Sequence, residues 1–295
     1  MLGSFLQRCR GWLIAPLLAA LQDSLKTAPR TVEQLALAAL YRQQFQQGLA
    51  PYRFHDIGFS VHSQHEEHGI LLYIFALIGT TDKRCVELCA GTGLECNTAN
   101  LIVNHKWGGL LVDGDEHNVA TGRAFYARHH NTRVWPPRFL REWVTRGNVN
   151  GIISGSGFVG DIDLLSIDVD GVDYWLWDAI DSISPRVVVT EINHLWGPER
   201  SVTVPYRDDF VGGFTEHGSD YAGASLAAFV KLGRRKGYRL VGTNSFATNA
   251  FFLRNDIGCA WLPEVEPRTC FDHPRARFGI EVRHAKIRDR EWQDV

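Results

Sequence analysis

The sequence predicts a Rossmann-like, doubly wound α/β fold with a seven-stranded and mostly parallel sheet. Short apolar runs alternate with segments of helical periodicity from residue 84 to residue 236, which is typical of repeated β-α units. The last two apolar runs, 238–242 and 250–254, are joined by a loop too short for a crossover helix, so these strands must pair antiparallel. With 295 residues, of which 45% are hydrophobic and 22% charged, the chain is long enough for one large domain with additions.

The first 54 residues are expected to form a helical extension. Residues 31–41 place apolar side chains at helical spacing behind Thr31, a plausible N-cap. An apolar run at 12–21 resembles a signal-peptide core in outline, but Pro16 interrupts it and it is too short to span a bilayer. The favoured interpretation is a short helix that packs on the domain or on a partner, and such helices would suit a homo-oligomer. We expect no transmembrane segment.

The remaining elements follow in chain order. A polar loop with four histidines, 55–68, precedes a nearly apolar stretch at 70–78 that suits a buried helix. We expect the strands at 84–89, 109–113, 132–135, 162–168, 186–191, 238–242 and 250–254. The helices between them are expected at 94–105, 116–130, 139–146, 172–183 and 224–236.

The segment at 197–223 is rich in Gly and aromatic residues and shows no clear period. A loop of this length inside a compact domain is more often a lid or substrate wall than disorder. The sequence therefore divides into an N-terminal helical extension (1–54), a core domain (55–258) with a lid insertion near 197–223, and a C-terminal extension (259–295).

A ligand site is expected at the end of the first strand. In an open α/β sheet, ligands bind beyond the C-terminal ends of the strands, near the point where the strand order reverses. There the chain turns around Gly91 and Gly93, whose small size lets the backbone approach a ligand, and the next helix offers free N–H groups. Asp113 ends the second strand, where a carboxylate can accept both hydroxyls of a ribose.

Glu87 lies inside the first strand, just before this turn, and distinguishes the pattern from a dinucleotide fingerprint. No third glycine follows at the spacing that NAD-binding folds use. An acid at this position could bind the ammonium of a methionine-like moiety, a group that NAD lacks. We therefore expect Glu87 and Asp113 to face one shared cavity.

Three motifs resemble those of known methyltransferases. Glu87-x-x-x-Gly91-x-Gly93, followed by Asp113, looks like the first two motifs of class I methyltransferases. The stretch at 162–171 resembles the Ile-Asp-x-Glu-Gly element of the FkbM-type methyltransferases. Ser63-Gln64-x-Glu66-Glu67 is similar to the Ser-Gln-x-x-Glu-Asp segment of that group.

This resemblance covers about residues 55–255 and departs from the family in two places. Cys89 stands where the usual motif has its first Gly, and Asp170 stands where Glu is commoner. The resemblance implies transfer of a methyl group from S-adenosylmethionine, most often to oxygen. The residues then expected to bind this cofactor are Gln64, Glu87, Gly91, Gly93, Asp113, Gly114 and Asp168.

Two neighbouring strands of the predicted sheet end in acidic and amide side chains. Asp168 and Asp170 follow the fourth strand, and Glu191 and Asn193 follow the fifth. Their oxygen atoms are the ligands that Mg²⁺ prefers. The pattern resembles the metal triad of catechol O-methyltransferase and of magnesium-dependent sugar O-methyltransferases, which implies Asp168, Glu191 and Asn193 as metal ligands. The alternative is that these side chains only cap turns and the following helix.

Asp168 and His194 are the candidate catalytic residues. An imidazole is a good general base for a hydroxyl proton near pH 7, although a histidine in a loop is more often only a hydrogen-bonding residue. The four histidines at 55–68 lack the spacing of a compact zinc site, so a loop that faces solvent or substrate is the simpler interpretation.

The expected function is methylation of a hydroxyl on a small molecule or on a sugar or glycan, with Mg²⁺ as an open second cofactor. The alternatives are a metal-free N- or C-methyltransferase, a non-catalytic binding module, and an NAD-dependent oxidoreductase, which the glycine spacing disfavours. The formal net charge of −2 disfavours nucleic acid as a partner. Six sparse cysteines without a Cys-x-x-Cys pair favour a reducing, cytoplasmic compartment.

Overall fold

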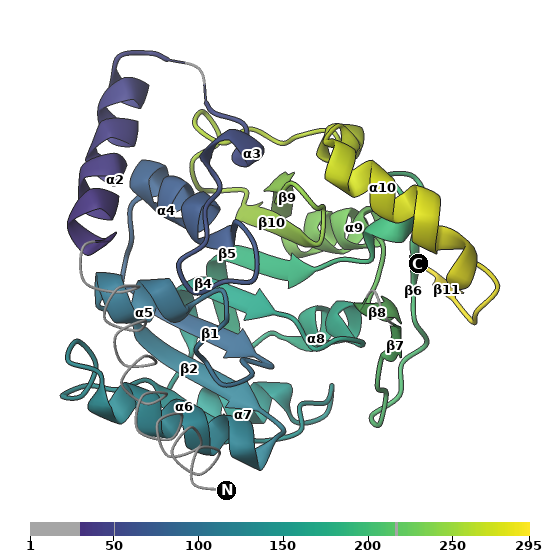
Figure 1. Cartoon of the computed structure of the whole chain (residues 1–295), viewed down its shortest axis with the longest axis horizontal. Helices are drawn as coiled ribbons and strands as arrows, with labels where there is room; N and C mark the ends of the chain where they lie inside the picture. Colours follow the sequence, from purple (N-terminus) through teal and green to yellow (C-terminus); the bar gives the residue numbers. More distant parts are fainter. Residues whose placement is uncertain (1–29, 50, 216–217) are drawn as a thin grey trace, which may run out of the picture.

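The computed structural model describes residues 30–49, 51–215 and 218–295 (Figure 1). The apolar run at 12–21 that we predict as a short helix lies outside these residues. Within the described part of the chain, every helix is too short or too polar to pass through a lipid bilayer.

A seven-stranded sheet with the order β3-β2-β1-β4-β5-β10-β9 forms the centre of the molecule. The neighbouring strands from β3 to β5 are parallel, whereas β10 runs antiparallel to both β5 and β9. The strands are β1 (Arg84–Leu88), β2 (Gly108–Asp113), β3 (Arg138–Arg141), β4 (Gly160–Ile167), β5 (Ile183–Glu191), β9 (Tyr238–Thr243) and β10 (Asn249–Arg254). The predicted fold class is therefore confirmed, including the antiparallel closing hairpin.

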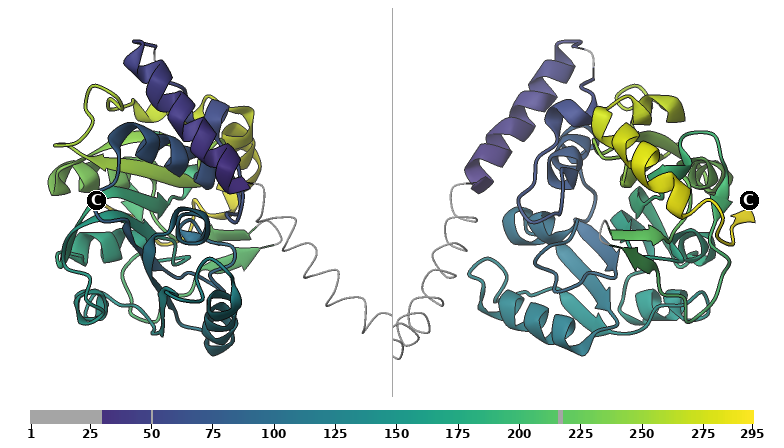
Figure 2. Two further views of the ribbon diagram at one scale, coloured as in Figure 1. Left: turned by 90° about the vertical axis from the view of Figure 1, so that its left-hand side faces the viewer. Right: turned by 45° about the vertical axis from the view of Figure 1, so that its right-hand side comes forward.

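Helices cover both faces of the sheet, and two apolar cores lie between the layers (Figures 1 and 2). One face carries α4 (Glu67–Ile78), α5 (Ala99–His105) and α6 (Glu116–Arg128), with α2 (Arg30–Gln46) outside α4. The other face carries α7 (Val149–Gly155), α8 (Asp173–Ala179) and α9 (Leu226–Lys236). The short helix α3 (Phe54–Ile57) connects the N-terminal part to this body.

Helix α4 is buried on all sides, because the sheet covers its inner face and α2 its outer face. Ile70 and Ile74 are fully buried, and the edge of the Tyr41 ring of α2 meets Tyr73 of α4 at a centroid distance of 4.9 Å. The sequence predictions of a helix at 31–41 and of a buried helix at 70–78 are confirmed.

The predictions for residues 132–146 were wrong. The third strand is 138–141 rather than 132–135, and α7 replaces the helix expected at 139–146. Trp135 is 83% exposed, whereas Phe139 is 4% exposed and packs over Gly122 of α6. The apolar side chain that the core requires therefore lies after the two prolines, which precede the strand instead of ending it.

A buried ion pair fastens the loop before β1 to the sheet. Asp163 of β4 is fully buried, and its carboxylate accepts backbone N–H bonds from Thr81, Asp82 and Lys83 at 2.7–3.1 Å. Arg186 of β5 donates Nη1 to the same carboxylate at 2.7 Å, and its other hydrogen bonds reach the backbone carbonyls at the end of α4. This network joins α4, β1, β4 and β5 at the edge opposite the strands' C-terminal ends.

The C-terminal residues return across the C-terminal edge of the sheet. They form η2 (Pro267–Phe271), α10 (Pro274–Arg283), η3 (His284–Lys286) and β11 (Gln293–Asp294). Helix α10 packs on η1 (His194–Trp196), the short turn that follows β5. The segment predicted as a lid contains β6 (Val202–Thr203), which pairs with β11, and the hairpin of β7 (Gly213–Thr215) and β8 (Gly218–Tyr221).

Candidate functional site

Two cavities open at the C-terminal edge of the sheet. The large cavity has a volume of about 890 Å³ and lies between the ends of β4 and β5, the loop that contains Gln64, and α10. The small cavity, about 60 Å³, lies beyond β1 and β2 and is lined by Cys89, Asp113, Gly114 and Trp143 among others. Both lie where ligands bind in open α/β sheets, since β1 and β4 flank the point at which the strand order reverses.

The turn after β1 is held in an unusual backbone conformation by Asp113. Cys89, Gly91 and Gly93 have φ angles of 62°, 55° and 69°, in the left-handed region. The Asp113 carboxylate accepts the N–H of Gly91 at 2.8 Å and that of Asp115 at 2.9 Å. Asp113 thus shapes the turn and also forms a wall of the small cavity, and its role as a ribose-binding carboxylate stays a prediction.

Cys89 occupies the first left-handed position of this turn, where a glycine would be unstrained. Its thiol lies at the small cavity, and burial raises the thiol pKa, with the charges of Asp113 and Asp168 raising it further. The backbone therefore keeps a left-handed conformation at Cys89, although this conformation is less favourable for a cysteine than for a glycine.

Glu87 does not face a cavity with Asp113. It is 2% exposed, and its carboxylate accepts the N–H groups of Asn97 and Thr98 at 2.9 and 2.8 Å. The Ser166 hydroxyl of β4 also donates to it at 3.1 Å. The prediction that Glu87 and Asp113 share one cavity is wrong, because the protein's own donors occupy Glu87. The hydrogen bonds from residues 97 and 98 to Glu87 also explain why α5 begins at residue 99 and not at 94.

The outer wall of the small cavity is closed by Trp143 and the segment around Asp208. The Trp143 indole N–H donates to the backbone carbonyl of Asp208 at 2.7 Å. Gly114 lies beneath the indole, and a Cβ atom there would come within 3.1 Å of it. Gly114, which the sequence predicts as a cofactor-binding residue, therefore provides space for the indole of Trp143 just after β2.

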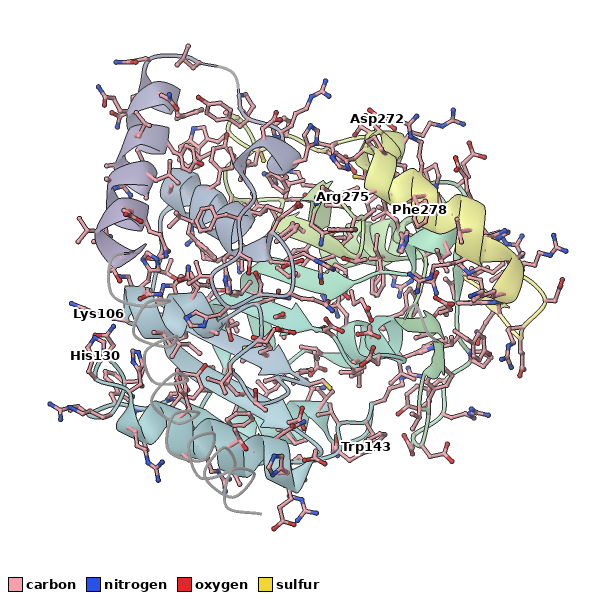
Figure 3. The ribbon with its side chains drawn as sticks, in the orientation of Figure 1. Lys106, His130, Trp143, Asp272, Arg275 and Phe278 are labelled. Atoms are coloured by element: carbon pink, nitrogen blue, oxygen red, sulfur yellow. The ribbon has the colours of Figure 1, made fainter. Side chains whose placement is uncertain are left out.

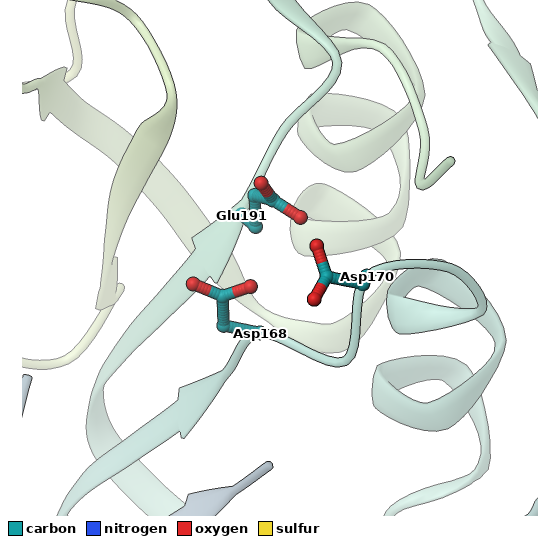
Figure 4. Close-up of side chains that lie close together, drawn as sticks. All are labelled: Asp168, Asp170 and Glu191. Atoms are coloured by element: carbon teal, nitrogen blue, oxygen red, sulfur yellow. The ribbon is translucent and has the colours of Figure 1, made fainter. Parts of the chain in front are cut away.

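Three carboxylates meet at the ends of β4 and β5 (Figure 4). Asp168, Asp170 and Glu191 each offer an oxygen atom, and these atoms lie within 4.8 Å of one another. β4 and β5 are adjacent and parallel, which brings their ends together as the sequence predicts. Asp173 supports the cluster, because its carboxylate accepts the N–H groups of Val169 and Gly171 and fixes the turn.

The surroundings of this cluster raise the pKa values of its carboxylates. Burial raises the pKa of Asp168 and of Glu191 well above the usual range, and the neighbouring acids, including each other, raise it further. Burial also raises the pKa of Asp170, and it raises that of Asp173 to about 6. A bound cation would relieve this cost by neutralising the negative charges.

The structure does not bring Asn193 into the acidic cluster. Its amide donates to the backbone carbonyls of Asp220 and Ala222 at 2.9 and 3.0 Å, and its oxygen accepts the N–H of Leu195 at 3.2 Å. The amide is thus used to cap η1 and to hold β8 and the residue that follows it. Asp170, which the sequence analysis had not chosen as a ligand, takes the third position.

His194 lines the large cavity but is enclosed by α10. Burial lowers the pKa of His194 to about 4, the charge of Arg283 lowers it further, and Asp220 partly opposes this. The imidazole is therefore neutral at pH 7 and a weaker base than a free histidine. Gly279 of α10 lies so close that a Cβ atom there would come within 2.2 Å of His194 Nε2.

Two glycines inside helices should respond in opposite ways to replacement by alanine, because only Gly279 has a close neighbour. Gly151 of α7 has open space around its missing Cβ, so Gly151→Ala should raise the free energy of unfolding by about 0.5–1 kcal/mol. Gly279→Ala should lower it by about 1–3 kcal/mol, because the methyl group forces α10 away from His194. Urea denaturation of both variants measures the difference. Equal stabilisation by both would show that α10 is not held at this distance.

The histidine-rich loop is organised by one buried imidazole. His68 Nδ1 accepts the N–H groups of Val61, His62 and Ser63 at 2.9–3.2 Å, so its proton lies on Nε2, which donates to the Cys96 carbonyl at 3.1 Å. Glu66 and Glu67, just before His68, accept hydrogen bonds from the segment 244–249 that follows β9. This places Gln64 at the large cavity, and its predicted role in binding the cofactor stays a prediction.

The buried state of His68 predicts a loss of stability in acid. Burial lowers the pKa of His68 from 6.5 to about 3, so the unfolded chain binds a proton at a higher pH than the folded protein. The free energy of unfolding should therefore fall as the pH decreases below 6.5. In His68→Asn the slope should be smaller by about 1.4 kcal/mol per pH unit. Urea denaturation between pH 7.5 and 5 tests this, and identical slopes would contradict it.

The sequence matches no protein-family profile and no curated protein. Among solved structures, the chain is similar to magnesium protoporphyrin IX methyltransferase from Synechocystis PCC 6803 with bound SAM, with 9% identity, a TM-score of 0.37, and 75% of this chain and 79% of that one covered. A glycopeptide N-methyltransferase complexed with SAM has 12% identity and a TM-score of 0.38, with 63% and 92% covered. The CcbJ methyltransferase from Streptomyces caelestis has 14% identity and a TM-score of 0.40, with 64% and 89% covered.

Proposed function

We propose that this protein is an S-adenosylmethionine-dependent methyltransferase that methylates a hydroxyl group, assisted by a divalent cation. The observation that carries the proposal is the pairing of two sites along one sheet edge. Asp113 and the left-handed turn after β1 form a wall suited to a ribose, and the acids at the ends of β4 and β5 line the adjoining large cavity. The FkbM-type resemblance stays a prediction.

The residues around the small cavity suit the nucleoside part of the cofactor. Asp113 Oδ2 has one hydrogen bond, to Gly91, and retains acceptor capacity toward a hydroxyl. Binding requires that Trp143 and the segment around Asp208 move apart, since 60 Å³ is far below the roughly 300–1,000 Å³ of common ligand sites. Because Glu87 is occupied, Asp168 rather than Glu87 is the carboxylate placed to attract the cationic end of the cofactor.

Asp168, Asp170 and Glu191 are the residues that would hold the cation. Three carboxylates are a hard donor set that suits Mg²⁺, and a cation would lower pKa values that burial and the neighbouring acids raise. A bound divalent cation supplies a Lewis acid that lowers the pKa of a hydroxyl group, and S-adenosylmethionine supplies an activated methyl group. His194, neutral at pH 7 and at the same cavity, is the proposed acceptor of the hydroxyl proton.

Isothermal titration tests the cofactor. We expect S-adenosylmethionine to bind the wild-type chain and NAD not to bind. Asp113→Asn should weaken S-adenosylmethionine binding at least about tenfold, which corresponds to 1.4 kcal/mol. Asp115→Ala is the matched control, since Asp115 lies two residues away and only caps α6. Tight binding of NAD alone, or equal affinity in both variants, would overturn the proposal.

A further inference from the structure

We propose that the methyl acceptor is a hydroxylated aromatic compound that carries an anionic group, and that Arg275 of α10 binds this group. The inference rests on the proposed function and names its substrate class. It follows from the part of the large cavity that lies opposite the acidic cluster, where α10 contributes Arg275, Phe278, Gly279, Val282 and Arg283.

Arg275 lies at this cavity (Figure 3), and only one nitrogen atom of its guanidinium donates to the described residues. Its Nη1 donates to Glu66 Oε1 at 3.1 Å and lies 3.4 Å from the Ser245 hydroxyl. The Glu66 carboxylate is shared with Ser245, whose N–H and hydroxyl donate to it at 2.8 and 2.6 Å. Among the described residues, nothing accepts from Nε or Nη2 of Arg275. These donors can bind a carboxylate or phosphate in bidentate fashion.

The second arginine of the cavity is already committed to a protein carboxylate. Arg283 donates both Nε and Nη2 to Oδ1 of Asp220, which is 2% exposed. A buried pair of this kind is costly to separate, so Arg283 serves to fasten α10 and not to bind a ligand. Arg275, with 52% of its side chain exposed, is therefore the arginine of this wall that can exchange partners.

Aromatic side chains line the part of the large cavity that contains Arg275. The guanidinium lies 4.6 Å from the centroid of the Phe246 ring, and His65 stacks on that ring at 4.4 Å with an interplanar angle of 27°. Phe278, one turn further along α10, is 64% exposed at the same cavity. An exposed phenylalanine beside a guanidinium plane is suited to stack on an aromatic ring.

The charge distribution in the cavity sets the orientation of the acceptor. Asp168, Asp170 and Glu191 lie at the sheet end, where the proposed cation would hold a hydroxyl group, whereas Arg275 supplies a positive charge at the α10 end. A hydroxyl at the sheet end, a ring against Phe278, and an anion at Arg275 satisfy all three walls. Such complementarity selects both a compound class and its direction.

Calorimetric titration of the full chain, saturated with Mg²⁺ and S-adenosylhomocysteine, tests this with two matched pairs of probes. We expect 3,4-dihydroxybenzoate to bind at least about tenfold more tightly than catechol, a difference of 1.4 kcal/mol. In Arg275→Gln this preference should disappear. Arg277→Gln is the control, because Arg277 is an exposed arginine of the same helix outside the cavity. Thermal unfolding of both variants confirms that each is folded.

Equal binding of catechol, an unchanged preference in Arg275→Gln, or no binding by either compound would overturn the inference. The second pair, glucose 6-phosphate and glucose, distinguishes the source of the anion. A preference confined to the sugar phosphate would overturn the aromatic assignment. Titration of 3,4-dihydroxybenzoate without the nucleoside tests Arg275 independently, so failure of S-adenosylmethionine to bind overturns the proposed function and not the anion site.

Discussion

Replacing Asp163 by alanine is expected to lower the free energy of unfolding by about 3–5 kcal/mol, because it leaves the buried Arg186 without its partner. Arg186 is 8% exposed, and the same carboxylate also satisfies the N–H groups of Thr81, Asp82 and Lys83. The loss includes the cost of those unsatisfied donors. Urea denaturation at pH 7 measures the change.

Asp161→Ala is the matched control for this variant. Asp161 lies two residues earlier on β4, is 66% exposed and pairs with Arg254, so its removal should cost at most about 1 kcal/mol. Similar losses in the two variants would contradict a special role for the buried pair. Burial alone would raise the pKa of Asp163, but the hydrogen bonds from Arg186 and the loop N–H groups outweigh it and lower the pKa below 3.8. This contribution is complete above about pH 4 and is lost as the pH falls through the folded pKa.

In Glu191→Gln, kcat for the methylated acceptor is expected to fall about 100- to 1,000-fold, since stabilisation by a correctly held cation contributes several kcal/mol. Binding of S-adenosylmethionine, measured by calorimetry, should change little because Asp113 and the turn after β1 are untouched. Mg²⁺ should raise the thermal midpoint of the wild-type protein and have little effect on the variant.

Without Mg²⁺, Glu191→Gln should be at least as stable as the wild type. The substitution removes one of the partly buried carboxylates whose pKa values are raised by burial and by their mutual repulsion. A loss of activity could then not be attributed to unfolding. Glu199→Gln, an exposed carboxylate 69% accessible and paired with Arg268, is the control. If Mg²⁺ stabilises wild type and Glu191→Gln equally, Glu191 is not a metal ligand.

Most of the sheet could be predicted because its strands are buried on both faces and therefore appear as continuous apolar runs, such as Val187 to Val189. The third strand was missed for a physical reason. It lies at the edge of the sheet, and arginines flank its apolar pair, Phe139 and Leu140. The two prolines before it suggested an end and not a beginning.

The acidic cluster could be predicted in part, because adjacent parallel strands bring Asp168 and Glu191 together. The direction in which each side chain points could not be predicted. Glu87 turns to the N–H groups of residues 97–98, and Asn193 turns to the loop before α9. Asp170 reaches the cluster through a left-handed backbone with φ of 52°, which no sequence period indicates. No sequence pattern near residues 274–283 indicates that α10 lines the large cavity, since this arises from packing between segments about 80 residues apart.

The thiol of Cys89 lies at the entrance to the proposed nucleoside site, yet it should react poorly. A thiol attacks electrophiles and is oxidised only as its thiolate, and burial together with Asp113 and Asp168 keeps this one protonated at neutral pH. Cys89 and Cys259 are both exposed, and alkylating agents such as iodoacetamide should label Cys259 well before Cys89, because the raised pKa of the Cys89 thiol disfavours its thiolate. The cysteine in this turn would thus place a sulfur atom beside the proposed site of a methyl donor without creating a competing nucleophile.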